Sequence, residues 1–532
     1  MKKFLALTLA IAMTLCVCFA AGCGDTPAET TTGKVTETTT AKPAEDTTVG
    51  SGENPATETT AATEDTTEAT VATEDTTEII PVDPMETWDG YAKLPGFEDV
   101  DFRGTTFVLA GKTTDDVSFP TDIEIYTEET DPVSTAVRER NATVEKLYNC
   151  KIECISSENP AGLVSAEVSS GKHTIDIYTR NGDAGAATSG ANYNLFTLGI
   201  DFSNSWWDQN YVSTYTVKNS AGTSVLYAAV GDFTITAFTA THAMMFNKNV
   251  YETKIAQGLG YDIYELVREG KWTMDIFVEM VKAAATDVSG NSEFAYDEGD
   301  ILGWARTTHA THGLHAASGL PLIINQNGTF KFTANEQAAQ WSDIMTKACE
   351  IWALHEAESL GYTNVREALT SGNTLFASEV LDVLRRMRDA DVSAGLVPYP
   401  KYTEDQETYA HYVDGHVAPY SVPTSVVEIE TVGKFLELYA AHSQKIVRST
   451  WIDTYCYEYC GDADSTEMLD IILNTRTYDP GYLYWSSSCE AEVSNMISTN
   501  KAQNFSKWVG RKEANINGEI ENFIAGIDDN KV

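Results

Sequence analysis

The sequence has few positive charges for its length. Its 532 residues include 36 Lys and Arg against 78 Asp and Glu, which gives a formal net charge of −42. Nucleic acids and anionic membrane surfaces repel a body of this charge. The composition therefore excludes nucleic acid as a partner.

The sequence also lacks a hydrophobic run long enough to span a bilayer. The apolar run from Phe4 to Phe19 holds 16 residues, fewer than the ~20 that a membrane-spanning helix needs. It follows a charged start, Met1–Lys3, and small residues follow it, which is typical of a secretory signal. We expect residues 1–22 to be a lipoprotein signal peptide that is removed.

Cysteine is scarce, and outside the signal no spacing matches a CxxC zinc pair. Cys150 and Cys154 lie four residues apart in a predicted strand, about 13 Å, too far for a mutual disulfide. The stretch Phe19–Cys23 resembles the bacterial lipobox, whose cysteine is diacylated and becomes the new N-terminus. We expect Cys23 to carry acyl chains such as palmitate and to anchor the protein to the cell membrane, facing outward. The alternative is an ordinary signal with a chance cysteine.

Large apolar side chains are almost absent from residues 23–80, which follow the signal. This segment is rich in Thr, Ala, Glu and Pro, and the sequence Thr-Glu-Asp-Thr-Thr-Glu occurs twice, at 63–68 and 73–78. Burial of apolar surface cannot offset the entropy of ordering such a chain. We expect a disordered tether between the lipid anchor and a folded body at 94–532.

Predicted strands and helices alternate at the start of this body. Strands are expected at Thr106–Ala110, Cys150–Ile155 and Ile175–Tyr178, with helices at about 134–148 and 162–170 between them. This order predicts parallel βαβ units and an α/β sheet. Ligands of such sheets bind beyond the carboxyl ends of the strands, which places a candidate site at Thr179–Asp183.

The middle of the chain carries a recognisable series of segments. These are MMFNKNVYE (244–252), YELVREGKWTMDIFVEMVKAA (264–284), LVPYPKY (396–402) and YSVPTS (420–425). Their order, behind a lipobox, resembles the family 1 extracellular solute-binding proteins of bacterial ABC importers, which are related to maltose-binding protein. The resemblance covers roughly residues 100–532.

This resemblance implies an α/β, two-lobed periplasmic-binding-protein-like fold with a hinge and an interlobe ligand cleft. Lobe 1 is expected at about 100–236 and 423–478, and lobe 2 at about 240–412 and 482–532. The implied function is capture of a small solute, most often a carbohydrate, for ABC permease subunits, by a monomer that is not an enzyme and needs no cofactor. The segments that cross the hinge, such as 233–239, should be extended.

By order along the chain, four zones would line the cleft, with planar polar groups for sugar hydroxyls and aromatic faces for sugar rings. The candidate residues are Arg180, Asn181, Asp183, Asp232, Trp304, His309, His312, Tyr482, Tyr484 and Trp485. Core packing of Trp304 and a turn-forming role for Asp232 remain open alternatives. The sequence does not identify the solute.

A second function rests on the same histidines. His309, His312 and His315 are spaced three residues apart, and histidines at this spacing on a helix can converge on zinc. A metal-binding lipoprotein or a secreted zinc hydrolase is the alternative. Gly313 weakens that helix, and no HExxH pattern occurs. We therefore expect no metal site and no catalytic residues.

The lipid anchor can be tested by Cys23→Ser. This change removes the thiol that would receive the diacylglyceryl group, so the protein should stay unprocessed or be released to the medium. Fractionation without detergent, followed by detection of the chain, measures the outcome. Unchanged retention in the membrane fraction would contradict a lipoprotein.

Overall fold

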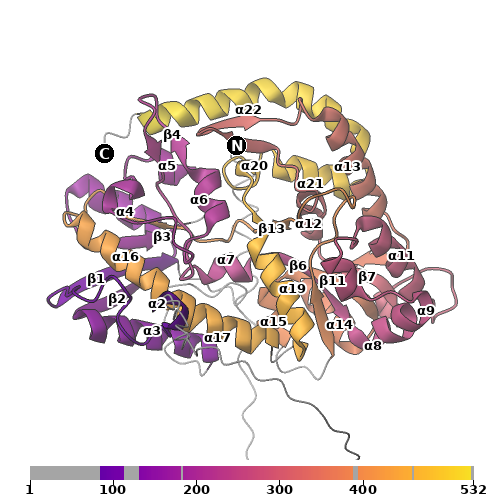
Figure 1. Ribbon diagram of the computed structural model, residues 1–532. Helices are drawn as coiled ribbons and strands as arrows, with labels where there is room; N and C mark the ends of the chain where they lie inside the picture. The colour runs from indigo at the N-terminus through magenta and orange to yellow at the C-terminus, as the bar shows by residue number, and fades with distance from the viewer. Residues whose placement is uncertain (1–83, 113–130, 181–183, 388–392, 458–459, 529–532) are drawn as a thin grey trace, which may run out of the picture. The chain divides into compact units, whose positions relative to one another are not determined.

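The computed structural model describes residues 84–112, 131–180, 184–387, 393–457 and 460–528. Cys23 and the expected tether lie outside these residues. Within the described body, the larger strands gather in two separate sheets (Figure 1).

The first sheet has the strand order β14-β3-β1-β2. Its strands are β1 (Thr105–Lys112), β2 (Cys150–Ser157), β3 (Ile177–Thr179) and β14 (Tyr420–Ser421). β1 pairs in parallel with both β2 and β3, and β14 pairs antiparallel to β3. The parallel βαβ order expected from the sequence is therefore confirmed.

Helices α3 (Pro132–Tyr148) and α4 (Pro160–Ser170) make the two crossovers of this sheet. α3 begins where the side chain of Asp131 accepts a hydrogen bond from the Ser134 backbone N–H, a common N-cap. It ends at Asn149, which adopts the left-handed conformation with φ 53°. Val137 and Val144 of this helix are buried.

The second sheet has the order β10-β7-β11-β6-β12. The strands are β6 (His242–Asn247), β7 (Leu302–Arg306), β10 (Ala357–Ser359), β11 (Thr374–Val380) and β12 (Ala394–Val397). β10, β7 and β11 are parallel neighbours, and β6 runs antiparallel to β11 and β12. The carboxyl ends of three adjacent strands therefore meet at one edge.

The other longer helices cover these sheets and the segments between them. They are α6 (Gln209–Tyr215), α10 (Ile263–Arg268), α11 (Met274–Ala284), α12 (Ala310–Ala316), α13 (Ala338–Trp352), α14 (Tyr362–Ser371), α15 (Asp382–Met387), α16 (Ile429–Ser443), α19 (Ala463–Asn474), α21 (Glu490–Ser498) and α22 (Phe505–Asp528). Shorter elements that matter below are α5 (Gly185–Thr188), α7 (Ile235–Thr239), η1 (Leu195–Leu198), α20 (Pro480–Leu483), the hairpin β8 (Ile323–Gln326) and β9 (Thr329–Phe332), and the pair β13 (His411–Tyr412) and β15 (Arg476–Thr477).

One short segment joins the two sheets. Val413 bridges Thr241, directly before β6, and Tyr420 pairs with Thr179 at the end of β3. β13 also pairs in parallel with β15. α19 lies against β12, where the Leu396 N–H donates to Ser465 Oγ at 3.2 Å, although its residues fall in the range expected for lobe 1.

The expectation that 233–239 is extended was wrong, because this segment contains the helix α7. Its β-branched residues favour extended backbone, but all five residues of α7 are buried. Threonine hydroxyls satisfy backbone carbonyls one turn earlier: Thr239 Oγ1 donates to Ile235 O, and Thr241 Oγ1 donates to Ala237 O. Burial and these hydrogen bonds override the local propensity.

The six cysteines of the described residues, Cys150 and Cys154 among them, are free thiols. No helix in the described ranges combines the length and the apolar character needed to cross a bilayer.

Close packing of α16 on η1 gives a stability prediction. A Cβ at Gly433 of α16 would lie 2.0 Å from the Leu198 carbonyl oxygen, a backbone atom that cannot rotate away. Gly433→Ala should therefore lower the free energy of unfolding by about 1–3 kcal/mol, measured by denaturant titration. Gly510→Ala, in α22 with open space around its Cβ, is the control and should stabilise by about 0.5–1 kcal/mol. Equal effects at the two positions would contradict the packing argument.

Candidate functional site

The carboxyl edge of the second sheet gathers polar and aromatic side chains from three strands. His309 follows β7, Tyr362 begins α14 after β10, and Asp382 begins α15 after β11. Because these strands are parallel neighbours, the three residues meet at one edge, where α/β folds bind ligands.

His309 and Tyr362 form an aromatic pair at this edge. The Tyr362 hydroxyl and His309 Nδ1 are hydrogen-bonded at 2.7 Å. Their rings are stacked, with centroids 5.8 Å apart and an interplanar angle of 23°. Tyr362 is 46% exposed, so a flat aromatic face remains open to a ligand. The sequence analysis found His309 but missed Tyr362.

His312 and His315 lie deeper and have separate partners. His312 Nε2 pairs with a Glu490 carboxylate oxygen, and the Tyr482 hydroxyl contacts Nδ1 of His315. Within the described residues, no group of three His, Cys, Asp or Glu side chains could hold a metal ion. The spacing of these histidines therefore reflects packing around Tyr412 and Tyr482 rather than convergence on one point.

Arginines surround two buried carboxylates at the end of β11. Arg366 Nη1 lies 3.2 Å from Glu379, and Arg385 and Arg386 both bind Asp382, at 3.1 Å and 2.7 Å. Burial raises the pKa of Glu379 to about 7. The sequence analysis did not single out this cluster, because charged residues at the start of a helix usually face solvent.

Arg180 lies at the corresponding edge of the first sheet. Its backbone N–H donates to Pro419 O at 3.2 Å, and its Nη1 lies 3.5 Å from the Tyr178 hydroxyl. Asn181 and Asp183, which were expected beside it, lie outside the described residues. Among the candidate residues expected at this edge of the first sheet, Arg180 is the one that the structure describes.

The segment 413–420 limits the distance between the two edges. Val413 pairs with Thr241, directly before β6, and Tyr420 pairs within the first sheet. The seven residue steps between these pairings span at most roughly 25 Å when extended. Asp414 and His416, which pair with each other, lie within it. The edges that carry Arg180 and His309 are thus tied to one short stretch of chain.

Asp232 belongs to a buried charge network between the crossing segments. It accepts a hydrogen bond from Gln444 Nε2 at 2.8 Å and lies 3.5 Å from Arg448 Nη1. Nearby, Asp208 binds Arg476 at 2.6 Å and the Tyr478 hydroxyl at 2.8 Å. Asp232 is 5% exposed, so in this structure it holds the hinge region together and offers no open face.

Three of the expected aromatic residues pack in the interior. Trp304 has no exposed surface, and its Nε1–H donates to Ser378 Oγ at 2.8 Å. Trp485 is 7% exposed, and Trp485 and the half-buried Tyr484 pack against Phe330 and Phe523. Phe523 of α22 thus packs against Tyr484 and Trp485, while Trp304 is buried against Phe277 and Trp352.

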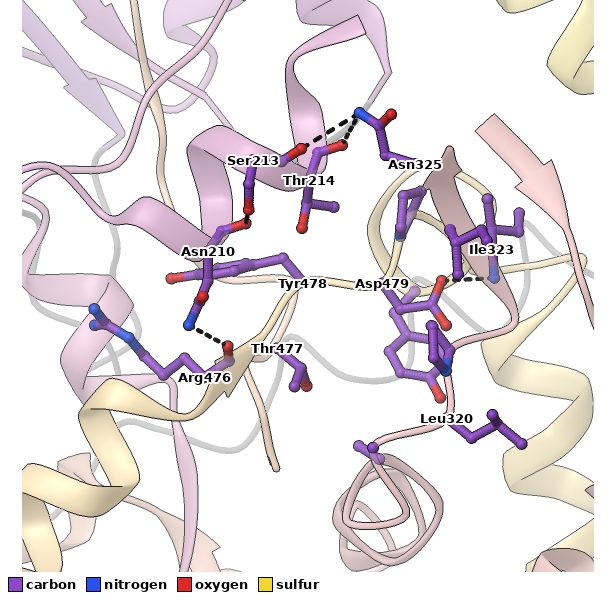
Figure 2. A pocket seen from close by; sticks show the side chains of 16 residues that line it. Asn210, Ser213, Thr214, Leu320, Ile323, Asn325, Arg476, Thr477, Tyr478 and Asp479 are labelled. Carbon is purple, nitrogen blue, oxygen red and sulfur yellow. Dashed lines mark hydrogen bonds between the residues drawn. The ribbon is translucent and has the colours of Figure 1, made fainter. Parts of the chain in front are cut away.

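Tyr482 lines a separate cavity of about 370 Å³ beside the last crossing. Figure 2 shows α6 side chains on one side, the stretch around Leu320 and Ile323 on the other, and Asp479 between them. Of the eight candidate residues that the structure describes, Tyr482 alone is among those that line this cavity.

Comparison with solved structures identifies the fold. A cyclo/maltodextrin-binding protein complexed with maltotetraose matches with a TM-score of 0.52, at 15% identity over 78% of this chain and 99% of that one. The sugar-binding protein MalE from Xanthomonas citri matches with a TM-score of 0.52, at 12% identity over 79% and 98%. The chain has the two-lobed fold of the periplasmic binding proteins.

A family 1 extracellular solute-binding protein from Bifidobacterium longum subsp. infantis is also similar, with 13% identity and a TM-score of 0.49 over 77% of this chain and 99% of that one. No family model and no curated protein sequence matches this chain. The fold expected from the resemblance is confirmed by the two structures with TM-scores of 0.52.

The buried position of Asp232 predicts a dependence of stability on pH. Burial raises its pKa from 3.8 to about 6, so between these pH values the folded protein binds more protons than the unfolded chain. The contribution of Asp232 to the free energy of unfolding therefore falls as pH rises through this window. Asp232→Asn does not titrate, so its stability relative to the unmodified protein should increase by up to about 3 kcal/mol from pH 4 to pH 7.

Urea titrations at both pH values measure this difference. In Asp232→Asn, Arg448 lacks its carboxylate partner at both pH values. The resulting loss in the free energy of unfolding is therefore the same at both and cancels in the comparison. A relative stability that does not change with pH would show that Asp232 is ionised at both.

Proposed function

We propose that this protein captures a small neutral or weakly charged solute of the carbohydrate class between its two lobes and delivers it to an ABC importer. The observation that carries the proposal is that one segment, 413–420, pairs within the first sheet at Tyr420 and at Val413 with Thr241, the residue before β6 of the second sheet. A solute held at both carboxyl edges would favour the state in which they approach each other. The maltodextrin-binding and MalE structures that share the fold bear sugar-binding names, which supports a sugar as the solute.

The residues proposed to hold the solute come from the two edges. Tyr362, backed by His309, supplies an aromatic face for the CH-rich side of a sugar ring. Arg180 supplies donors from the first sheet, and Asp414 with His416 supplies acceptor and donor groups from the segment between them. Asn181 and Asp183 remain predictions for the same edge.

We infer further that lipid on Cys23 holds the protein at the outer face of the membrane and that it acts as a monomer without enzymatic activity. The lobe boundaries stay as expected, except that α19 (463–474) is assigned to the second lobe because it packs on β12. The metal-binding alternative loses its support from His312 and His315, since Glu490 and Tyr482 contact them.

A thermal-shift screen tests the proposal. The full chain is heated with monosaccharides, with oligosaccharides and with Zn²⁺ in separate samples, because a ligand that binds only the folded state raises the melting temperature. At least one sugar should raise it. If Zn²⁺ raises it and none of the sugars does, the metal-binding function replaces the one proposed.

Tyr362→Ala then tests the site. Loss of the aromatic face should weaken binding of the sugar found in the screen by about 1 kcal/mol, roughly fivefold, as measured by calorimetric titration. The matched control is Tyr91→Ala, since Tyr91 is 54% exposed and also bonds through its hydroxyl to a side chain, that of Glu139. Equal affinity in the two variants would remove the aromatic pair from the site.

A further inference from the structure

The cavity at the last crossing has walls of two different kinds. One face of α6 contributes Asn210, Ser213 and Thr214, whose i, i+3 and i+4 spacing places them side by side. The facing wall is mainly apolar, with Leu320, Pro321, Ile323 and Ile324 among its residues. Hydroxyl and amide groups thus face an apolar surface across a space of about 370 Å³, at the small end of ligand sites.

The two charged groups that line this cavity already have partners. Arg476 binds Asp208 at 2.6 Å, so an anionic ligand would find no unpaired cation among the described lining residues. Asp479, 5% exposed, accepts backbone hydrogen bonds from Gly481 at 2.7 Å and from Ile323 at 3.2 Å. Burial raises the pKa of this carboxyl to about 7, so at neutral pH it carries only part of a negative charge.

Acceptor capacity nevertheless remains on the α6 wall. Asn210 uses its amide Nδ2 on the carbonyl oxygens of Arg476 and Asn474, which leaves its Oδ1 as an acceptor. The Ser213 hydroxyl donates to Asn210 O and can still accept.

We propose that this cavity is a second ligand site, which binds a neutral polyhydroxylated ring such as a monosaccharide or a cyclitol. The hydroxyls would face the α6 wall, and the CH face of the ring would lie on the wall at 320–324. The aromatic pair Tyr362–His309 does not line this cavity, so the site is distinct from the one at the sheet edges.

Protection from alkylation tests the site locally. Thr214→Cys places a thiol in the polar wall, and the control Ser165→Cys places one on exposed α4. The serine replaced there, like Ser213, donates to a carbonyl of its own helix. D-glucose, D-galactose and myo-inositol are the probes, and peptide mass spectrometry reads the iodoacetamide reaction of each cysteine in the full chain. At least one probe should slow the reaction at position 214 severalfold and leave position 165 unchanged; no slowing with any probe overturns the proposal.

Calorimetric titration separates this site from the sheet-edge site. With the protecting probe, the unmodified chain should show a binding event that Ser213→Trp removes by filling the cavity, whereas the control Ser165→Trp retains it. Tyr362→Ala should leave this event intact. If Ser213→Trp retains the binding, or if Tyr362→Ala abolishes it, the protection came from the sheet-edge site, and the second site is overturned while the proposed function stands.

Discussion

The structure depends on one stretch of backbone that connects the two sheets. Val413 pairs beside the second sheet and Tyr420 pairs within the first, where Tyr420 also bridges Ala229. A rotation of one sheet relative to the other must be absorbed by the few residues between these pairings. Such a connection allows a hinge motion and keeps the two carboxyl edges within reach of one ligand.

Buried charge reinforces this connection. The chain has only 36 Lys and Arg, yet several arginine side chains bind groups in the interior. Arg476 and Arg448 pair with Asp208 and Asp232 at the crossings, and Arg140, with no exposed surface, lies 3.8 Å over the ring of Tyr439. Desolvation makes such pairs poor sources of net stability, but removing one partner is costly. We infer that they fix the geometry of the crossings, and that the outer surface is left more acidic as a result.

Local patterns in the sequence predicted the parallel βαβ order of the first sheet, whereas the two-lobed fold was expected only from the family resemblance. The strands β1, β2 and β3 and the helices between them follow hydrophobic periodicity and clear caps, such as Asp131 before α3. α7 escaped prediction because its residues favour strands, and only their burial and threonine hydrogen bonds make a helix there. Hydrophobic periodicity thus predicts an element well where one apolar face of that element packs on the core. It predicts poorly where tertiary burial and hydrogen bonds determine the backbone conformation.

The candidate site was harder to predict because aromatic residues serve two purposes in this chain. Trp485 and Tyr484 lie in a Tyr- and Trp-rich stretch, and from composition alone they are good stacking residues. α22, however, lies over them and brings Phe523 against both rings, a contact between segments about 40 residues apart in sequence that no local pattern reports. Tyr362, in contrast, stands alone at the start of a helix, and its exposure follows only from the position of β10 at the sheet edge. An aromatic side chain is available to a ligand where no helix packs over it. The role of such a residue therefore depends more on where its element lies in the fold than on its neighbours in sequence.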